Sequence, residues 1–192
     1  FNLGHAYMGD EVPALRNLDE AEHWYQEALR LFKEVKSKNI AQAIGQLGVV
    51  AHEHFMDAKK EGRAEEELLN HLNAATNYYQ QALALLPPDA VNDLAMSYRN
   101  LGNIYADAGD IENSLKIYNQ SIHYSETEGN LYQAGETRFN IAITLANHGR
   151  LTDALLYARA ALRNFESYGG RAQDQEDQTK ELIAAIEEAM KG

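Results

Sequence analysis

Two histidines separated by a single residue, His52 and His54, are the first candidates for metal chemistry in this chain. The segment around them has a helical pattern, and residues at i and i+2 of a helix point about 200° apart. Two such imidazoles cannot chelate one ion, and the HExxH spacing of helical zinc sites is missing because Glu53 stands between them. We predict no metal site here and interpret His52 as a residue that faces solvent or a ligand.

The acidic residues give no better case for catalysis. Asp107, Asp110 and Glu112 lie close together, but the twelve-residue spacing and the final bidentate glutamate of a calcium loop are absent. Asp110 is explained as the cap of the helix that follows it. The glutamate runs at 65–67 and 187–188 are typical of solvated helix surface rather than of acid–base pairs. Because no phosphate-binding loop, dinucleotide fingerprint or nucleophile elbow occurs either, we predict no cofactor and expect that the chain is not an enzyme.

The composition narrows the class of protein and its partners. Hydrophobic residues make up 45% of the 192 residues and charged residues 24%, which suits an ordered, mostly helical chain. The net charge of −12 argues against a nucleic-acid partner, since that affinity comes largely from clustered Lys and Arg. The chain has no cysteine, which is compatible with a reducing compartment. No apolar run approaches the roughly 20 residues of a membrane span, and the start does not resemble a signal peptide. We expect a cytoplasmic protein without a membrane partner.

The strongest pattern is a repeat with a period of 40 residues. The stretch 98–124, YRNLGNIYADAGDIENSLKIYNQSIHY, returns at 138–164 as RFNIAITLANHGRLTDALLYARAALRN, so that Leu101-Gly102 matches Ile141-Ala142. Gly102 has no side chain and lets a neighbouring helix approach closely, and Ala142 allows almost the same approach. The large residues before and after Gly102 fall at i, i+3 and i+7, which places them on one helical face. Two earlier segments carry the same columns: Leu3-Gly4, Tyr7, Ala21, Tyr25 and Ala28, then Ile44, Leu47-Gly48, Ala51, Ala75, Tyr79, Ala82 and Pro87.

These columns resemble the tetratricopeptide repeat, a helix–turn–helix unit, over nearly the whole chain. The family pattern of a large residue, Leu-Gly, Tyr, Ala, an aromatic residue and Ala is matched by Tyr98, Leu101-Gly102, Tyr105, Ser114, Tyr118 and Ser121. The resemblance implies an all-α, right-handed α-solenoid of about four repeats with a C-terminal capping helix. The expected divisions are 1–37, 38–88, 89–129 and 130–170 for the repeats and 171–191 for the capping helix. Arg138 replaces a large residue in the fourth repeat, and we expect it at the edge of the stack.

Three irregularities interrupt the array. The chain enters the first repeat about one helical turn late, so we expect more protein upstream of Phe1. Tyr7 and Ala21 are 14 residues apart, against nine for the matching pair in the third repeat, and Val12, Leu15 and Leu18 of this longer linker are expected to cover a neighbouring element. In the second repeat an excess of 15 residues predicts two helices that each run on by about two turns, with a tip near Gly62.

The hydrophobic pattern also predicts how the added helices are covered. Inside the elongated hairpin we expect an apolar cluster of four residues: Phe55, Leu68, Leu69 and Leu72. On the last helix, one apolar stripe is expected to shield the end of the array from water. Its members are Leu182, Ile183, Ile186, Ala189 and Met190.

In this family the first helix of each repeat lines a concave groove, and ligands are bound by the side chains that point away from the packed columns. Carried over to this chain, the resemblance implies four groups of groove residues. They are His5 and Met8; Gln42, Val49, His52 and Glu53; Met96, Arg99, Asn103 and Asp107; and Glu136, Phe139, Ile143 and Asn147. Arg99 and Asn103 are one turn apart and suit a carboxylate or a peptide backbone. A clamp for a C-terminal carboxylate is not expected, because such clamps need several basic residues in the groove.

The resemblance implies a protein-interaction module that binds a peptide or protein segment in this groove. Repeats of this length and wording are similar to those of kinesin light chains and of the C-terminal arrays of bacterial multidomain signalling proteins, where the array acts as a sensor or scaffold. The alternative is a self-assembly scaffold, in which the elongated hairpin or the N-terminal face meets another copy of the chain. Fold alone does not separate these two functions.

Overall fold

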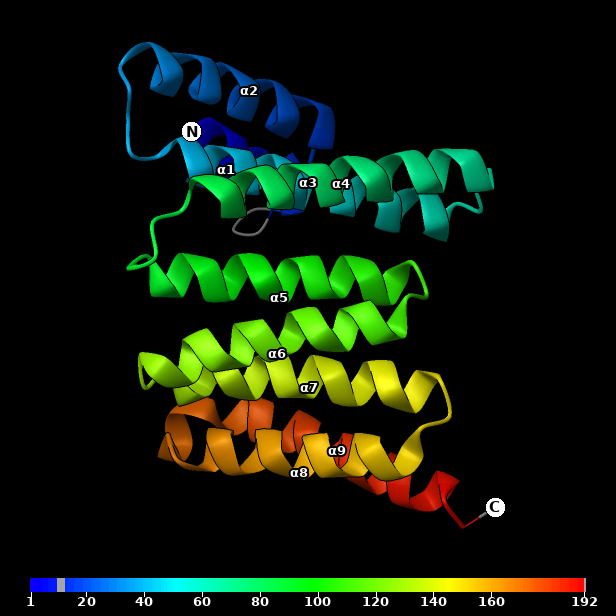
Figure 1. Ribbon diagram of the computed structural model, residues 1–192. Helices are drawn as coiled ribbons and strands as arrows, with labels where there is room; N and C mark the ends of the chain where they lie inside the picture. The colour runs from blue at the N-terminus through cyan, green and yellow to red at the C-terminus, as the bar shows by residue number, and fades with distance from the viewer. Residues whose placement is uncertain (10–12, 192) are drawn as a thin grey trace. The chain divides into compact units, whose positions relative to one another are not determined.

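The computed structural model describes residues 1–9 and 13–191, and every regular element within them is helical. The predicted all-α class is therefore confirmed (Figure 1). In chain order the elements are α1 (Asn2–Met8), the 3-10 turn η1 (Pro13–Leu15), α2 (Leu18–Glu34), α3 (Ile40–Lys60), α4 (Glu65–Leu85), α5 (Val91–Asp107), α6 (Ile111–Thr127), α7 (Leu131–Asn147), α8 (Leu151–Glu166), the 3-10 turn η2 (Gly169–Ala172) and α9 (Gln173–Ala189). The chain forms two compact units, Phe1–Pro88 and Asp89–Gly192. Within each unit, consecutive helices pack in pairs, as they do in a helical-repeat solenoid.

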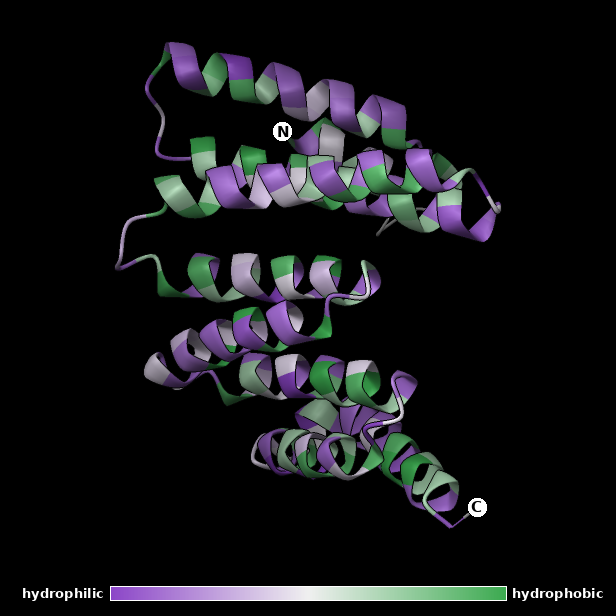
Figure 2. Ribbon diagram, turned by 45° about the vertical axis from the view of Figure 1, so that its right-hand side comes forward, coloured by the Kyte–Doolittle hydropathy of each residue, from purple (hydrophilic) through white to green (hydrophobic). Residues whose placement is uncertain are grey.

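The first compact unit contains α1 to α4. Its core joins Met8, Tyr25, Leu47 and Val50 from three successive helices. Polar residues dominate the outer side of α2, as an amphipathic helix at a surface requires (Figure 2). Leu18 of the linker region is buried and Leu15 is half exposed, whereas Val12 lies outside the described residues.

The α3–α4 hairpin is longer than the helix pairs of the second unit. Helix α3 continues 13 residues beyond Leu47, whereas α5 continues only six beyond Leu101. Helix α4 likewise begins ten residues before Ala75, against three for α6 before Ser114. Each helix thus carries seven additional residues, which is about two turns at 3.6 residues per turn. Gly62 makes the tip with a left-handed φ of 68°, and the tip projects beyond α2 (Figure 1).

The second compact unit contains α5 to α9. Tyr118, Ile141, Leu145 and Ile186 are buried together in its largest core cluster, so α6, α7 and α9 share one apolar interior. The cap predicted at Asp110 is present, since its carboxylate accepts the backbone N–H of Asn113 at 3.3 Å. This bond satisfies one of the N–H groups that lack a partner at the start of any helix.

A glycine facing a tyrosine ring recurs at the closest approach of paired helices. A Cβ added to Gly102 would lie 2.5 Å from the ring of Tyr118, a distance that real carbon atoms do not reach. The fourth repeat reaches close packing differently, because both members of the pair are small there. The three glycine pairs, in chain order, are Gly4 with Tyr25, Gly48 with Tyr79 and Gly102 with Tyr118. The matching positions of the fourth repeat, Ala142 and Ala158, are buried in one core cluster. An alanine at the glycine position therefore fits only where the tyrosine is replaced by a smaller residue.

Three predictions about coverage are wrong. Leu69 is 50% exposed on the outer side of the hairpin, so only Phe55 and Leu72 of the predicted cluster are fully buried there. Ala189 and Met190 are exposed as well, because α9 packs on α8 through its middle, at Leu182, Ile183 and Ile186. The spacing of apolar residues predicts which face of a helix is buried, but it does not predict how much of the helix length a neighbouring helix covers.

Arg138 is also not at the edge of the stack, since its side chain is only 17% exposed. Its guanidinium donates to Asn164 Oδ1 on α8 at 2.7 Å and pairs with Glu126 Oε1 on α6 at 2.5 Å. A long Arg stem can pack against apolar neighbours while its head group stays paired, and this explains why it replaces a large apolar residue here.

Candidate functional site

The first helices of the two repeats in the second unit, α5 and α7, present one joint surface, which we call the α5–α7 face. It contains Met96, Arg99 and Asn103 from α5 with Glu136, Phe139, Asn140 and Ile143 from α7. Arg99 Nη1 lies 2.5 Å from Glu136 Oε2, and the two side chains are 19% and 36% exposed. The structure therefore brings together two predicted site residues that are 37 positions apart and neutralises their charges against each other.

Asn103 is fixed by two hydrogen bonds from opposite sides. Its Oδ1 accepts the Tyr118 hydroxyl at 2.7 Å and the Asn140 side-chain amide at 3.0 Å. Burial raises the pKa of Tyr118 to about 12, so this phenol stays protonated and remains a donor under ordinary conditions. With its oxygen engaged twice, Asn103 can offer a ligand its amide N–H groups rather than its carbonyl. The residue is a preorganised donor on the α5–α7 face.

A hollow of about 160 Å³ lies beside this face, between α7, α8 and α9. We call it the α7–α9 hollow. Phe139 and Phe165 border it, but Phe165 is only 1% exposed, so the accessible aromatic surface comes from the partly buried Phe139. Asn140, Gln175 and Gln178 contribute primary amides. The hollow thus combines an apolar surface with groups that both donate and accept hydrogen bonds.

The other predicted residues of the second unit differ in how far they are exposed. Met96 and Ile143 are exposed at 44% and 37%, so each places an apolar side chain in water on the α5–α7 face. Phe139 is partly buried and packs against the cluster that includes Phe165. Asp107 is partly buried and Asn147 is exposed.

The predicted residues of the first unit behave less uniformly. Met8 is only 7% exposed and belongs to the core, so its prediction as a ligand contact is wrong. Val49 is partly buried against the same core, and Gln42 is exposed. His5 bonds through Nδ1 to the Tyr25 hydroxyl at 3.0 Å. His52 stacks on Phe55 with ring centroids 6.0 Å apart, which gives this histidine a packing role.

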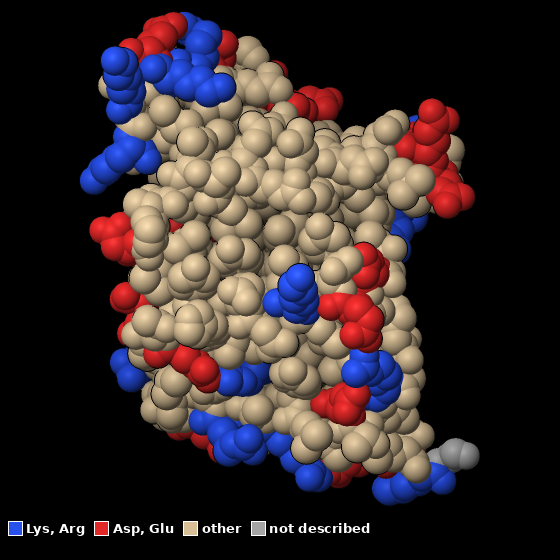
Figure 3. Space-filling view, viewed as in Figure 1, with Lys and Arg blue, Asp and Glu red and all other residues tan. Residues whose placement is uncertain are grey.

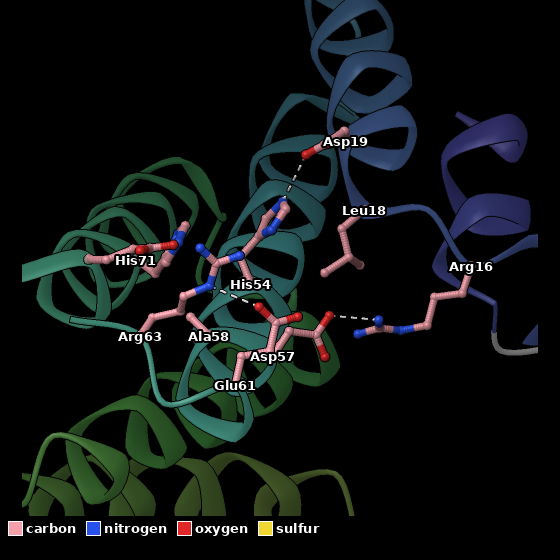
Figure 4. Close-up of a pocket in the computed structure, with 10 residues that line it drawn as sticks. Arg16, Leu18, Asp19, His54, Asp57, Ala58, Glu61, Arg63 and His71 are labelled. Carbon is pink, nitrogen blue, oxygen red and sulfur yellow. Dashed lines mark hydrogen bonds and ion pairs between the residues drawn. The ribbon is translucent and has the colours of Figure 1, made fainter. Parts of the chain in front are cut away.

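A second, polar pocket of about 260 Å³ lies where the linker meets the elongated hairpin (Figure 4). Arg16 of the linker donates to Asp57 at 2.7 Å and to Glu53 at 3.0 Å, and the bond to Asp57 is the main cause that raises the pKa of Arg16. His54 and His71 stack across α3 and α4 with centroids 5.4 Å apart. Most of these side chains come from residues that a regular repeat lacks. The pocket therefore joins the two irregular segments of the first unit.

Two further findings concern metal ligands and membrane-spanning helices. Across residues 1–9 and 13–191, no three His, Asp or Glu side chains converge as a metal site would require. In that same part of the chain, no helix has the length and apolar character needed to cross a membrane.

Figure 3 shows acidic side chains at the tip of the α3–α4 hairpin and basic ones near the C-terminal end of α2. Charge thus gathers at helix ends of the first unit.

Sequence reasoning missed the α7–α9 hollow. Gln175 and Gln178 were assigned to a capping helix, and Phe165 lies outside the columns that define the repeat. The only signal was their spacing, because Gln175, Gln178 and Thr179 fall on one face of a helix at i, i+3 and i+4. The Thr179 hydroxyl donates to the Gln175 carbonyl at 2.6 Å, so the hydroxyl satisfies its own hydrogen bond within α9.

Comparison with known proteins agrees with these helix pairs. A family model described as tetratricopeptide repeat matches residues 93–167, which span most of α5 through α8. Among solved structures, the crystal structure of BtubC (BKLC) from P. vanneervenii has a TM-score of 0.62 and 15% identity, and the match covers 99% of this chain and 83% of that one. At this identity the likeness concerns the fold alone. No curated protein matches the sequence.

The family match and the observed packing lead to one assignment. The matched segment contains the α5–α6 and α7–α8 helix pairs, and with them the contact of Gly102 with Tyr118 and the α5–α7 face. Residues 93–167 resemble tetratricopeptide repeats both in their match to the family model and in the packing of their helix pairs.

Proposed function

We propose that this chain is a non-catalytic module that binds a peptide or protein segment on the α5–α7 face. Tetratricopeptide repeats generally mediate protein–protein interaction. The observation that carries the proposal is the arrangement of Asn103. Its carbonyl oxygen accepts hydrogen bonds from Tyr118 and Asn140, so the side chain is held in place and its amide N–H groups can be offered to a ligand. Exposed Met96 and Ile143 flank it, and apolar side chains around a fixed polar group are typical of a protein contact surface.

Selection of random peptides displayed on phage tests this proposal. Peptides selected on the unmodified chain are measured again on Ile143→Ser and on Leu156→Ser, since both changes remove an exposed apolar side chain. Leu156 is 64% exposed on α8, so it serves as the matched control away from the α5–α7 face. We expect Ile143→Ser to weaken binding at least five-fold and Leu156→Ser to leave it unchanged. Equal affinities for both variants, or no selected peptide at all, would remove the α5–α7 face from consideration.

We further propose that the module acts in the cytoplasm, as the sensor or scaffold part of a larger bacterial signalling protein. Two features of the sequence support this: the 40-residue repeats resemble the arrays of such proteins, and the chain contains no cysteine. The sequence of the full-length parent protein tests it. A neighbouring signalling domain would support the sensor role, and a parent without one would contradict it.

Self-assembly is a second candidate function, favoured by the elongated hairpin. Met56 and Leu69 are 44% and 50% exposed on α3 and α4, and neither is needed for packing inside the hairpin. Exposed apolar side chains on a projecting element suit a contact with a second copy. Sedimentation analysis over a wide concentration range tests this. We expect Leu69→Lys to abolish any dimer, and a chain that stays monomeric at millimolar concentration would exclude the function.

A further inference from the structure

We propose that the α7–α9 hollow receives one large apolar side chain of an extended stretch of the bound segment that is free of acidic residues. This inference rests on the proposed function, because it names the kind of segment that the α5–α7 face binds. The hollow lies directly beside that face, since Glu136, Phe139 and Asn140 belong to both. A segment that crosses Asn103 and Asn140 therefore reaches the hollow within a few residues.

The size and lining of the hollow set the first requirement. Its volume is about 160 Å³. A cavity of about 150 Å³ lined by apolar side chains is large enough to bind benzene. The partly buried Phe139 supplies the accessible ring surface here, and it packs against the buried cluster of Ala161, Phe165 and Ala172. A leucine, methionine or phenylalanine side chain has the size and the apolar character to fill this space.

The rim of the hollow sets the second requirement. Asn140, Gln175 and Gln178 each carry an amide, which has a donor and an acceptor in the same arrangement as a peptide group. Asn140 already donates to Asn103 at 3.0 Å, so its carbonyl oxygen is left to accept a backbone N–H. An extended backbone leaves its own N–H and C=O groups available, whereas a helix satisfies them internally.

The charges around the hollow set the third requirement. Glu136 lines it, but this carboxylate is paired with Arg99 at 2.5 Å and does not call for a cation. An acidic residue would lose hydration against the phenylalanine rings without gaining a free basic partner. The whole chain carries a net charge of −12, which further disfavours an acidic segment. The side chain bound in the hollow is therefore not acidic.

Nuclear magnetic resonance titration of the ¹⁵N-labelled chain tests the inference with minimal peptide units. The probes are N-acetyl-leucine methylamide and N-acetyl-phenylalanine methylamide, each of which has two peptide groups and one apolar side chain. The glycine analogue lacks the side chain and the glutamate analogue adds a charge. We expect the leucine and phenylalanine probes to shift the side-chain amide signals of Asn140, Gln175 and Gln178 in a saturable manner. The glycine and glutamate probes should bind at least three-fold more weakly.

Two variants separate the hollow from the rest of the surface. Gln178→Leu removes an exposed rim amide while keeping its size, and Gln120→Leu makes the same change on the exposed side of α6. We expect at least three-fold weaker leucine-probe binding for the first and no change for the second. Equal binding of the glycine and leucine probes, or an unaffected Gln178→Leu variant, would overturn the anchor assignment. If phage-selected peptides still depend on Ile143 in that case, the proposed function stands and only this inference fails.

Discussion

The glycine–tyrosine contact between α5 and α6 gives the sharpest test of how these repeats pack. In Gly102→Ala, the new Cβ would lie 2.5 Å from Tyr118 Cδ1 and 2.7 Å from Cε1. The ring cannot move away easily, because it is 1% exposed and its hydroxyl is bonded to Asn103 at 2.7 Å. Overpacking of this kind costs about 1–3 kcal/mol, while the better helix propensity of alanine returns about 1 kcal/mol. We expect a net loss of about 0–2 kcal/mol in unfolding free energy.

Gly45→Ala is the matched control, because Gly45 is also inside a helix but has no atom within 4 Å of an added Cβ. The same chemical change should stabilise the chain there by about 0.5–1 kcal/mol. Urea denaturation followed by circular dichroism measures the overall effect, and hydrogen exchange of α5 and α6 shows where it acts. The free energy of unfolding should thus fall in Gly102→Ala and rise in Gly45→Ala.

A double-mutant cycle then asks whether the ring is the cause. Tyr118→Ala alone should cost about 3–5 kcal/mol, as large-to-small core changes do. In that background Gly102→Ala should cost nothing or stabilise, which is the combination that the fourth repeat already has at Ala142 and Ala158. If Gly102→Ala is as stable as Gly45→Ala, or if its cost persists without the tyrosine ring, the packing explanation is refuted.

Three further predictions concern single groups. Burial raises the pKa of Tyr118 to about 12 from an ordinary value near 10, so the contribution of the protonated phenol to stability is complete below pH 10 and is lost as the pH rises towards 12. Up to about 2–3 kcal/mol of unfolding free energy should disappear over that window. Denaturation at pH 9 and pH 11.5 measures this loss, and Tyr118→Phe should make it smaller. Ala64 occupies the N-cap of α4 with extended backbone and no side-chain cap, so Ala64→Ser should raise the free energy of unfolding by about 1 kcal/mol. An unchanged denaturation midpoint would show that the first backbone N–H groups of α4 gain nothing from a side-chain cap. Arg16→Gln should speed hydrogen exchange at the end of α3 while lowering global stability by less than about 1 kcal/mol, since its partners are about 40% exposed; an effect that persists in 1 M salt would contradict an ionic origin.

The fold was largely predictable because it depends on local periodicity. The columns around Leu101-Gly102 and Ile141-Ala142 specify helix faces and close approach, and both follow from residue type and spacing. The expected turn at Gly62 and cap at Asp110 also follow from local chemistry. The exposure of Leu69 and Met190 did not, because whether an apolar face is covered depends on where the neighbouring helix ends.

The candidate site was predictable only in part. Periodicity placed Arg99, Asn103 and Glu136 on one side of their helices, but the Arg99–Glu136 ion pair joins side chains 37 residues apart and needs the third dimension. Met8 was misplaced because α1 has only seven residues, too few to define a wet face and a packed face by spacing. The α7–α9 hollow depends on the angle at which α9 packs against α7 and α8, and the spacing of residues in the repeat does not predict that angle.

The contact of Arg16 with Glu53 and Asp57 has a consequence for anyone who shortens this chain. Trimming α3 and α4 to regular length would delete Asp57 and His54 and leave the linker arginine with one carboxylate. Conversely, a linker cut to the usual nine residues could no longer bring a guanidinium to the hairpin. The two extra segments therefore form one structural part, and a shortened version of this domain must keep both or remove both.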